Sequence, residues 1–186
     1  ALVNIGSETV SVSVYENDTL ISLAVFPIGS VNITHDIALG FQIPIHQADD
    51  IKHGTYDGPI SKKKLTDIIE ARTEDIWELI KNHLKSLSRD VLLPGGIIIT
   101  GGGGMLGGIV QMAKASLGLP VRTIAPEHVF KNPKRDLDQS WLPAFGLCFM
   151  SGIKTPEIDI APPKNIKNIA KEAKGGFKKF LEQFIP

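Results

Sequence analysis

A run of glycines follows a short β-branched segment in the second half of the chain. Ile97–Thr100 has the composition of a buried strand, Gly101–Gly104 follow directly, and Ile109–Leu117 has helical spacing. Glycines between a strand and a helix N-terminus leave bare backbone, which a phosphate or a flat base can approach closely. The segment lacks the Gly-Lys-Ser/Thr of a P-loop and fits the dinucleotide fingerprint poorly. Taken alone, it predicts either a nucleotide site or a tight structural turn.

Histidine, cysteine, serine and aspartate residues are present, but their spacing matches neither a metal site nor a catalytic triad. The five histidines, at positions 35, 46, 53, 83 and 128, do not pair with one another or with Cys148 at metal-ligand spacing, so we expect no metal site. No Gly-x-Ser-x-Gly elbow follows a strand, which argues against a hydrolase triad. Trp77 and Trp141 fall on expected helices and are interpreted as packing residues. The residues alone therefore indicate no catalytic group.

Composition narrows the class of protein. Among the 186 residues, 20 are basic and 20 are acidic, so the overall charge does not favour nucleic acid as a partner. Cys148 is the single cysteine and lies in an apolar run, which predicts a buried thiol in a reducing compartment. No apolar stretch approaches the ~20 residues that cross a bilayer, and no signal segment opens the chain. We expect a cytosolic protein, and because Ala1–Gly6 already has the pattern of a strand interior, we expect a fragment that lacks its N-terminal part.

Hydrophobic periodicity predicts strands first and then alternating helices and strands. Glu16-Asn-Asp18 has hairpin-turn chemistry, Asn32 is a candidate N-cap, and Gly54 is a candidate helix end. The expected elements are strands at 2–5, 10–15, 20–27, 97–100 and 119–124, and helices at 33–41, 46–53, 62–88, 109–117 and 139–150. The helix at 62–88 is amphipathic, with charges opposite its apolar stripe. This order predicts an α/β lobe with a mixed sheet over residues 1–151.

The C-terminal residues differ in composition from this lobe. Residues 152–168 contain three prolines and few large apolar side chains, which predicts an extended linker. Residues 169–186 place an apolar stripe on one helical face with lysines around it. This pattern favours an amphipathic helix on an anionic membrane surface, with Phe177, Lys178, Phe180, Leu181 and Phe184 as membrane contacts. The alternatives are a helix that docks on its own domain or in the groove of a partner protein.

Several segments together resemble the FtsA family of bacterial cell-division proteins, within the actin-like ATPase superfamily. The more specific part is 27–38, which ends in Thr34-His-Asp-Ile-Ala38 and is similar to the family's Thr-x-Asp-Ile-Ala. The resemblance continues through Ala48–Lys52, Ile69–Arg72, the glycine run, Pro120–Arg122 and Ala144–Leu147. It implies the second half of an FtsA-like protein. Residues 1–151 would be the second lobe of an actin-like (ribonuclease H-like) fold, with a nucleotide-facing core at about 1–45 and 92–151 and a small helical/β subdomain inserted at about 46–91.

The resemblance also implies which residues would contact nucleotide. The hairpin that follows Asn4 would hold the β- and γ-phosphates, a carboxylate and a lysine on the 46–53 helix would flank the ribose and base, and the glycine run would lie against the adenosine. The implied nucleotide-binding residues are Gly6, Ser7, Thr9, Asp49, Lys52, Gly101, Gly102, Gly103 and Met105. Amides and hydroxyls for phosphate, and bare backbone for a planar base, suit these roles.

The chain departs from the family pattern at the phosphate hairpin. Asn4 stands where the family usually has Asp, and it lacks the charge that holds hydrated Mg²⁺. Glu8 stands where the hairpin is commonly glycine-rich, and its carboxylate would repel phosphate if it pointed inward. The first phosphate loop is absent from these residues. ATP and Mg²⁺ are therefore expected cofactors of the full-length protein, which would be at most a weak ATPase, and the fragment alone is expected not to hydrolyse ATP.

The implied role is a scaffold that tethers FtsZ filaments to the cytoplasmic membrane at the division site, on its inner face. Arg72, Glu74 and Asp75 on the long helix would contact the C-terminal peptide of FtsZ, although an ordinary charged helix face explains them as well. Self-association into actin-like filaments is also implied, and no nucleic acid is expected. The alternatives are a PilM-like pilus-assembly scaffold, or an enzyme or chaperone of the sugar-kinase or Hsp70 type.

Overall fold

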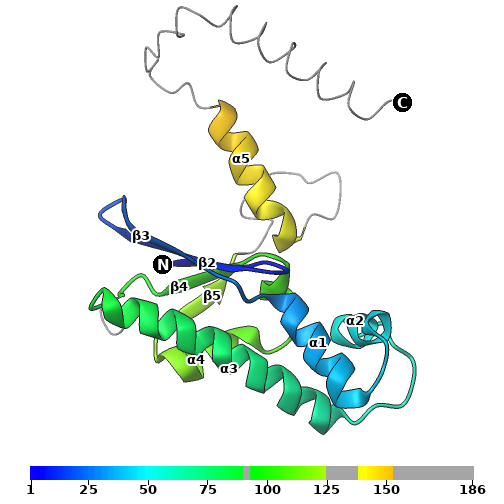
Figure 1. Ribbon diagram of the computed structural model, residues 1–186. Helices are drawn as coiled ribbons and strands as arrows, with labels where there is room; N and C mark the ends of the chain where they lie inside the picture. Colours follow the sequence, from blue (N-terminus) through cyan, green and yellow to red (C-terminus); the bar gives the residue numbers. More distant parts are fainter. Residues whose placement is uncertain (90–92, 125–137, 153–186) are drawn as a thin grey trace, which may run out of the picture. The chain divides into compact units, whose positions relative to one another are not determined.

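Five strands form one mixed sheet in the computed structural model, which describes residues 1–89, 93–124 and 138–152 (Figure 1). The sheet has the order β3-β2-β1-β4-β5. Its strands are β1 (Leu2–Ile5), β2 (Val10–Glu16), β3 (Thr19–Phe26), β4 (Ile97–Thr100) and β5 (Val121–Thr123). Strand β2 is antiparallel to β1 and β3, whereas β1, β4 and β5 are parallel. The predicted mixed sheet is confirmed.

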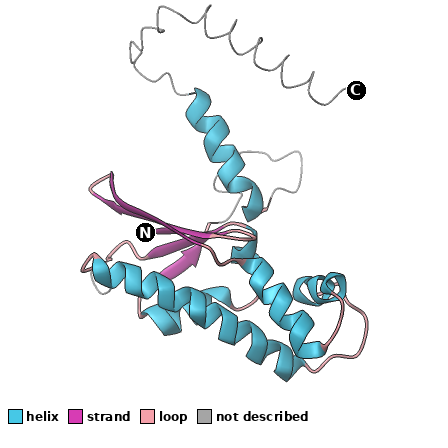
Figure 2. Cartoon of the chain, viewed as in Figure 1, coloured by secondary structure: helices cyan, strands magenta, loops and turns pink. Residues whose placement is uncertain are grey.

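Helices occupy most of the sequence between the strands (Figure 2). They are α1 (Ser30–Phe41), α2 (Ile45–His53), α3 (Lys62–Ser86), α4 (Ile109–Leu117) and α5 (Leu142–Gly152), with 3-10 turns at Gly102–Met105 and Gln139–Trp141. Within the described ranges, no helix has both the length and the apolar composition needed to cross a membrane. The chain divides into a compact unit at Ala1–Leu147 and a second unit that begins at Cys148.

The main core lies between the sheet and two helices, α3 and α4, which cover the same face (Figure 1). Alternate residues of the strands point into this core because side chains in a strand have a period of two. Val3 and Ile5 of β1 are at most 1 % exposed, as is Ile99 of β4. Trp77 of α3 is fully buried among them, so its prediction as a packing residue is confirmed. Burying a side chain of this size stabilises the fold by about 3 kcal/mol or more.

A second, smaller core holds α1, α2 and the N-terminal half of α3 together. Its buried residues are Ile33, Ile37, Ala38, Ala48 and Ile51. The side chains of Leu65 and Ile68 on α3 pack against them, as their helical spacing predicts. Helix α2 ends at Gly54 with φ of 74°, which confirms the predicted glycine cap. The three helices therefore share a core of their own beside the sheet.

Helix α1 begins three residues earlier than predicted, and Asn32 is not its N-cap. The N–H groups of Ser30 and Val31 donate to the carbonyls of Gly6 and Ser7, at 3.0 and 2.8 Å. These bonds from the β1–β2 hairpin fix the first turn, so Gly29 becomes the N-cap. Asn32 instead accepts a hydrogen bond from the Gly29 N–H at 2.9 Å. A distant hairpin sets this helix start, which local sequence does not reveal.

Two predictions of burial are wrong near the C-terminal end of the described residues. Trp141 is 54 % exposed, and Cys148 is also exposed. Trp141 lies in the 3-10 turn before α5, and α5 carries no charged residue over its whole length. A segment that is apolar all round predicts burial but does not indicate which face is covered. Cys148 is the first residue of the second unit.

Candidate functional site

The register of the sheet brings the phosphate-type hairpin and the glycine run together. Strands β1 and β4 are parallel, and Asn4 pairs with Thr100 at their C-terminal ends. In open α/β sheets, ligands bind beyond these ends. Gly101 has φ of 86°, and a Cβ there would lie 2.4 Å from Asn4 Oδ1 and 2.5 Å from the Ile5 carbonyl oxygen. Only glycine allows the two turns to approach this closely.

A cavity of about 900 Å³ opens beside these turns. Its wall includes eight of the nine predicted nucleotide residues, which come from the β1–β2 hairpin, α2 and the glycine run: Gly6, Ser7, Asp49, Lys52, Gly101, Gly102, Gly103 and Met105. The ninth residue, Thr9, is exposed, and its carbonyl closes the hairpin by accepting from the Gly6 N–H at 2.9 Å. The volume is in the range that small-molecule and cofactor sites occupy.

Asp49 and Lys52 form an ion pair on α2 at the edge of this cavity. Lys52 Nζ lies 2.8 Å from Asp49 Oδ1 and also donates to Thr34 Oγ1 on α1 at 2.8 Å. The side chain of Lys52 is 11 % exposed, whereas that of Asp49 is 49 % exposed. The hydrogen bond from Lys52 lowers the pKa of the Asp49 carboxyl below its ordinary value. Asp49 is thus held as a carboxylate in an accessible position, as binding to ribose hydroxyls requires.

Sequence reasoning missed part of the cavity wall. Ser30 lies at the start of α1, His53 at the end of α2, and Asp138 and Ser140 precede α5. Asp138 Oδ1 accepts hydrogen bonds from the Ser140 N–H and hydroxyl, which caps the 3-10 turn. The Asp-x-Ser spacing is a recognisable capping signal. Nothing in the sequence, however, indicates that this turn packs beside Gly102.

The cavity wall does not fit a protein-held Mg²⁺. Such an ion is bound through one or two carboxylates together with phosphate oxygens. Among the described residues, the carboxylates of the wall are those of Asp49, paired with Lys52, and Asp138, which caps a turn. Asn4, at the end of β1, is neutral, and its buried Oδ1 has no hydrogen-bond partner in the described part of the chain. Glu8 is exposed and is not part of the wall.

The predicted FtsZ-binding residues on α3 do not form one open surface. Arg72 donates through Nε and Nη2 to the two carboxylate oxygens of Asp36 on α1, at 2.6 and 3.0 Å. Its Nη1 donates to Asp75 at 3.0 Å. The hydrogen bond to Asp36 raises the pKa of Arg72 above its ordinary value. Arg72 therefore fastens α3 to α1, and Asp75 is part of the same cluster.

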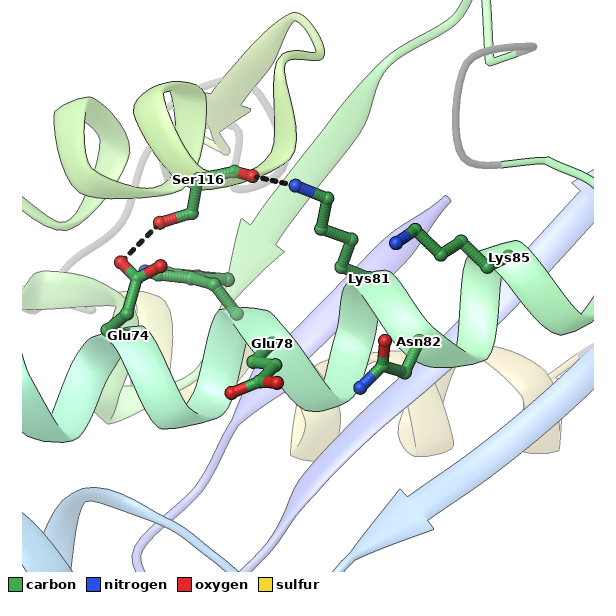
Figure 3. Close-up of a pocket in the computed structure, with 7 residues that line it drawn as sticks. Glu74, Glu78, Lys81, Asn82, Lys85 and Ser116 are labelled. Carbon is green, nitrogen blue, oxygen red and sulfur yellow. Dashed lines mark hydrogen bonds between the residues drawn. The ribbon is translucent and has the colours of Figure 1, made fainter.

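Glu74 belongs to a different place, a cavity of about 260 Å³ beside α3 and α4 (Figure 3). Ser116 Oγ donates to Glu74 at 2.6 Å, and Lys81 Nζ donates to the Ser116 carbonyl at 3.1 Å. Figure 3 shows Glu74 and Lys81 extending towards Ser116, whereas Glu78 points away from it. Trp77 also lines this cavity, and its Nε1 donor is buried without a partner among the described residues.

The remaining predicted site residues lie outside the described part of the chain. These are the proposed membrane contacts Phe177, Lys178, Phe180, Leu181 and Phe184. The 152–168 linker likewise falls outside it, apart from Gly152, the last residue of α5. Within residues 1–89, 93–124 and 138–152, no three or more His, Cys, Asp or Glu residues are grouped so that they could hold a metal ion.

Comparison with known proteins gives the family. The family model of "Cell division protein FtsA" matches residues 1–140. The cell division protein FtsA of Bacillus subtilis is 32 % identical over 151 residues, which cover 69 % of this chain and 34 % of that protein. The chain spans between about a third and a half of the length of the curated relatives it matches.

Solved structures agree on the fold. MreB 5 of Spiroplasma citri bound to AMPPNP superposes with a TM-score of 0.63 at 14 % identity, over 94 % of this chain and 54 % of that one. A PilM-PilN type IV pilus biogenesis complex gives a TM-score of 0.65 at 19 % identity, over 80 % of this chain and 44 % of that one. At this identity the two structures support the actin-like fold, and the matched family model decides among the families that share it. The chain belongs to the FtsA family of cell-division proteins.

Proposed function

We propose that this chain is the nucleotide-binding and membrane-tethering half of a scaffold that links FtsZ filaments to the cytoplasmic membrane. The proposal of nucleotide binding rests on one observation: eight of the predicted nucleotide-binding residues, from three separate segments, line the same cavity. The family membership carries the cell-division role. The likeness to MreB 5, whose structure holds AMPPNP, supports ATP as the ligand. Weak ATP hydrolysis remains a proposal for the full-length protein only.

In this proposal, each part of the wall has a separate task. The backbone N–H groups of the hairpin around Ser7 bind phosphate, and the half-exposed carboxylate of Asp49 accepts from ribose hydroxyls. Lys52 holds Asp49 in place and adds a positive charge at the cavity edge. The flat backbone at Gly102 and Gly103 lies against the base. When bound, Mg²⁺ would shield the phosphates of the nucleotide.

Calorimetric titration of the chain with ATP tests the nucleotide part. Lys52→Met keeps the apolar stem and removes the charge, and we expect it to weaken binding about tenfold. Lys114→Met is the matched control, because Lys114 is an exposed lysine on α4 outside the cavity wall. Wild-type chain that binds no ATP, or two variants with equal affinity, would contradict the proposed site.

We propose that the FtsZ peptide docks beside α3 at the Glu74 cavity, because Arg72 and Asp75 are occupied by intramolecular pairs. The cavity offers charges of both signs, from Glu74 and Glu78 on one side and Lys81 and Lys85 on the other. Lys85→Glu reverses an exposed charge at its edge without touching the core. We expect it to weaken the binding of a fluorescent FtsZ C-terminal peptide, measured by anisotropy, while Lys114→Glu does not. Equal affinities for the two variants would place the peptide elsewhere.

The tethering part of the proposal depends on the sequence of residues 169–186. An apolar face with Phe177 and Phe180, flanked by lysines, suits an anionic bilayer surface, where each lysine contributes about 1 kcal/mol. Co-sedimentation with anionic vesicles tests it on the whole chain. The double change Phe177→Asp and Phe180→Asp should abolish sedimentation and leave the melting transition in place. Loss of the melting transition would instead mean that the segment packs on its own domain.

A further inference from the structure

The amide of Asn4 is a polar group in the nucleotide cavity that no described contact uses. Its residue lines the cavity at the end of β1, and its Oδ1 is buried without a hydrogen-bond partner among the described residues. A buried polar atom left unpaired in this way destabilises the fold. The close packing against Gly101 keeps the amide at the base of the two turns. Asn4 lines the cavity while its Oδ1 is buried, and no hydrogen bond among the described residues uses its amide N–H groups, so these N–H groups are the part of Asn4 left for a ligand that enters the cavity.

The chemistry of an amide differs from that of the carboxylates around it. Asn offers N–H donors as well as a carbonyl acceptor, and a half-turn of its amide plane exchanges the two. An N–H donor bonds directly to a phosphate oxygen, whereas a carboxylate at the same place would repel it unless a cation intervened. Asp49 and Asp138, the carboxylates of the wall within the described ranges, already have partners.

We infer that the Asn4 amide donates directly to a phosphate oxygen of the bound nucleotide, so that this lobe binds nucleotide without a protein-coordinated divalent cation. The inference rests on the proposed nucleotide-binding function and specifies how the phosphates are held. It makes Asn4 the residue that sets the metal requirement of binding. The backbone N–H of Ser7, whose neighbour Gly6 uses its own N–H to close the hairpin, then shares the phosphates with it.

The test compares ADP affinity in Mg²⁺ and in EDTA by calorimetric titration of the chain. The wild type should bind with affinities within about threefold of each other. Asn4→Asp should lose about tenfold or more in EDTA, through repulsion of the phosphates, and should recover when Mg²⁺ is added. Asn4→Ala should weaken binding to a similar extent in both conditions because it removes the donor alone. Asn82→Asp makes the same chemical change on α3, away from this cavity, and should leave both affinities unchanged.

The outcomes separate the inference from the function it rests on. A wild type that loses affinity in EDTA as strongly as Asn4→Asp would overturn the inference and leave nucleotide binding intact. Absence of ADP binding by every variant in both conditions would overturn the proposed function itself. If Asn4→Asp fails to fold, as its melting transition would show, the wild type and Asn4→Ala still decide, because the inference requires both to bind independently of Mg²⁺.

Discussion

The proposed nucleotide cavity and the charged face of α3 are built in opposite ways. The cavity wall includes several glycines from the turns where strands β1 and β4 end. The α3 face is made of charged side chains, and its central residue, Arg72, is tied to Asp36 and Asp75. Glycine backbone that lines an open cavity is available to a ligand. Side chains that already form ion pairs with one another are less available to a ligand. This difference distinguishes a candidate binding site from a structural contact.

The two aspartate pairs show the same contrast on a smaller scale. Arg72 engages both carboxylate oxygens of Asp36, which is 25 % exposed. Lys52 engages mainly one oxygen of Asp49, which is 49 % exposed. A bidentate pair leaves few acceptor positions for another partner. Lys52 and Thr34 both donate to Oδ1 of Asp49, whereas Oδ2 has only His53 Nδ1 nearby, at 3.4 Å, and so retains acceptor positions. Similar residue types therefore have different capacities for binding.

The largest expected effect comes from breaking the cavity wall at Gly101. Gly101→Ala puts a Cβ against Asn4 Oδ1 and the Ile5 carbonyl at a residue with φ of 86°. We expect a loss of roughly 2–4 kcal/mol in the free energy of unfolding, measured by urea denaturation. Gly102→Ala is the control, because its Cβ would meet only Ser140 Cβ at an ordinary 3.7 Å. Equal stability of the two variants would show that the strand ends do not need this close approach.

Breaking the Arg72–Asp36 contact between α3 and α1 should lower the free energy of unfolding by less than Gly101→Ala does. Arg72→Ala removes two hydrogen bonds to Asp36 between α3 and α1, and both side chains are partly exposed. We expect a loss of about 2 kcal/mol in thermal or urea unfolding. Asp75→Ala removes only the exposed partner and should change stability by at most about 0.5 kcal/mol. A stable Arg72→Ala variant would return Arg72 to the list of candidate binding residues.

The elements that form the cavity could be predicted from the sequence, but the contacts that bring them together could not. The strand at 10–15 and the glycine turn after the 97–100 strand are confirmed, because hydrophobic periodicity and turn-forming residues are local signals. The pairing of Asn4 with Thr100 could not be read from local patterns, because it depends on which strands meet. The approach of Asp138 and Ser140 to the glycine run is also tertiary. Arg72 and Asp75 had the spacing of any charged helix, and only the position of α1 shows that they are occupied.

A change in the Asp49–Lys52 pair should affect ATP affinity much more than the free energy of unfolding. Lys52→Met leaves Asp49 hydrated and keeps the lysine stem in place, so the free energy of unfolding should change by at most about 1 kcal/mol. ATP affinity, in contrast, should fall about tenfold. Arg72→Ala should show the reverse pattern, with lower stability and unchanged affinity per folded molecule. Parallel losses in both variants would remove the distinction between the two pairs.

The smallest expected effect is a pH dependence of stability that belongs to Asp49. Lys52 lowers the pKa of this carboxyl in the folded state, so its contribution is complete above the unfolded pKa and disappears as the pH falls through the folded one. The effect therefore lies below about pH 4, and Asp49→Asn should flatten the acid limb of the unfolding free energy there. Asp57→Asn, an exposed aspartate without an ion pair in the described part of the chain, should leave the Asp49 contribution in place. Since Asp49 is half-exposed, solvent screens the interaction. Identical acid limbs for the wild type and Asp49→Asn would mean that Lys52 provides no net stabilisation, and its task at the cavity would then be binding alone.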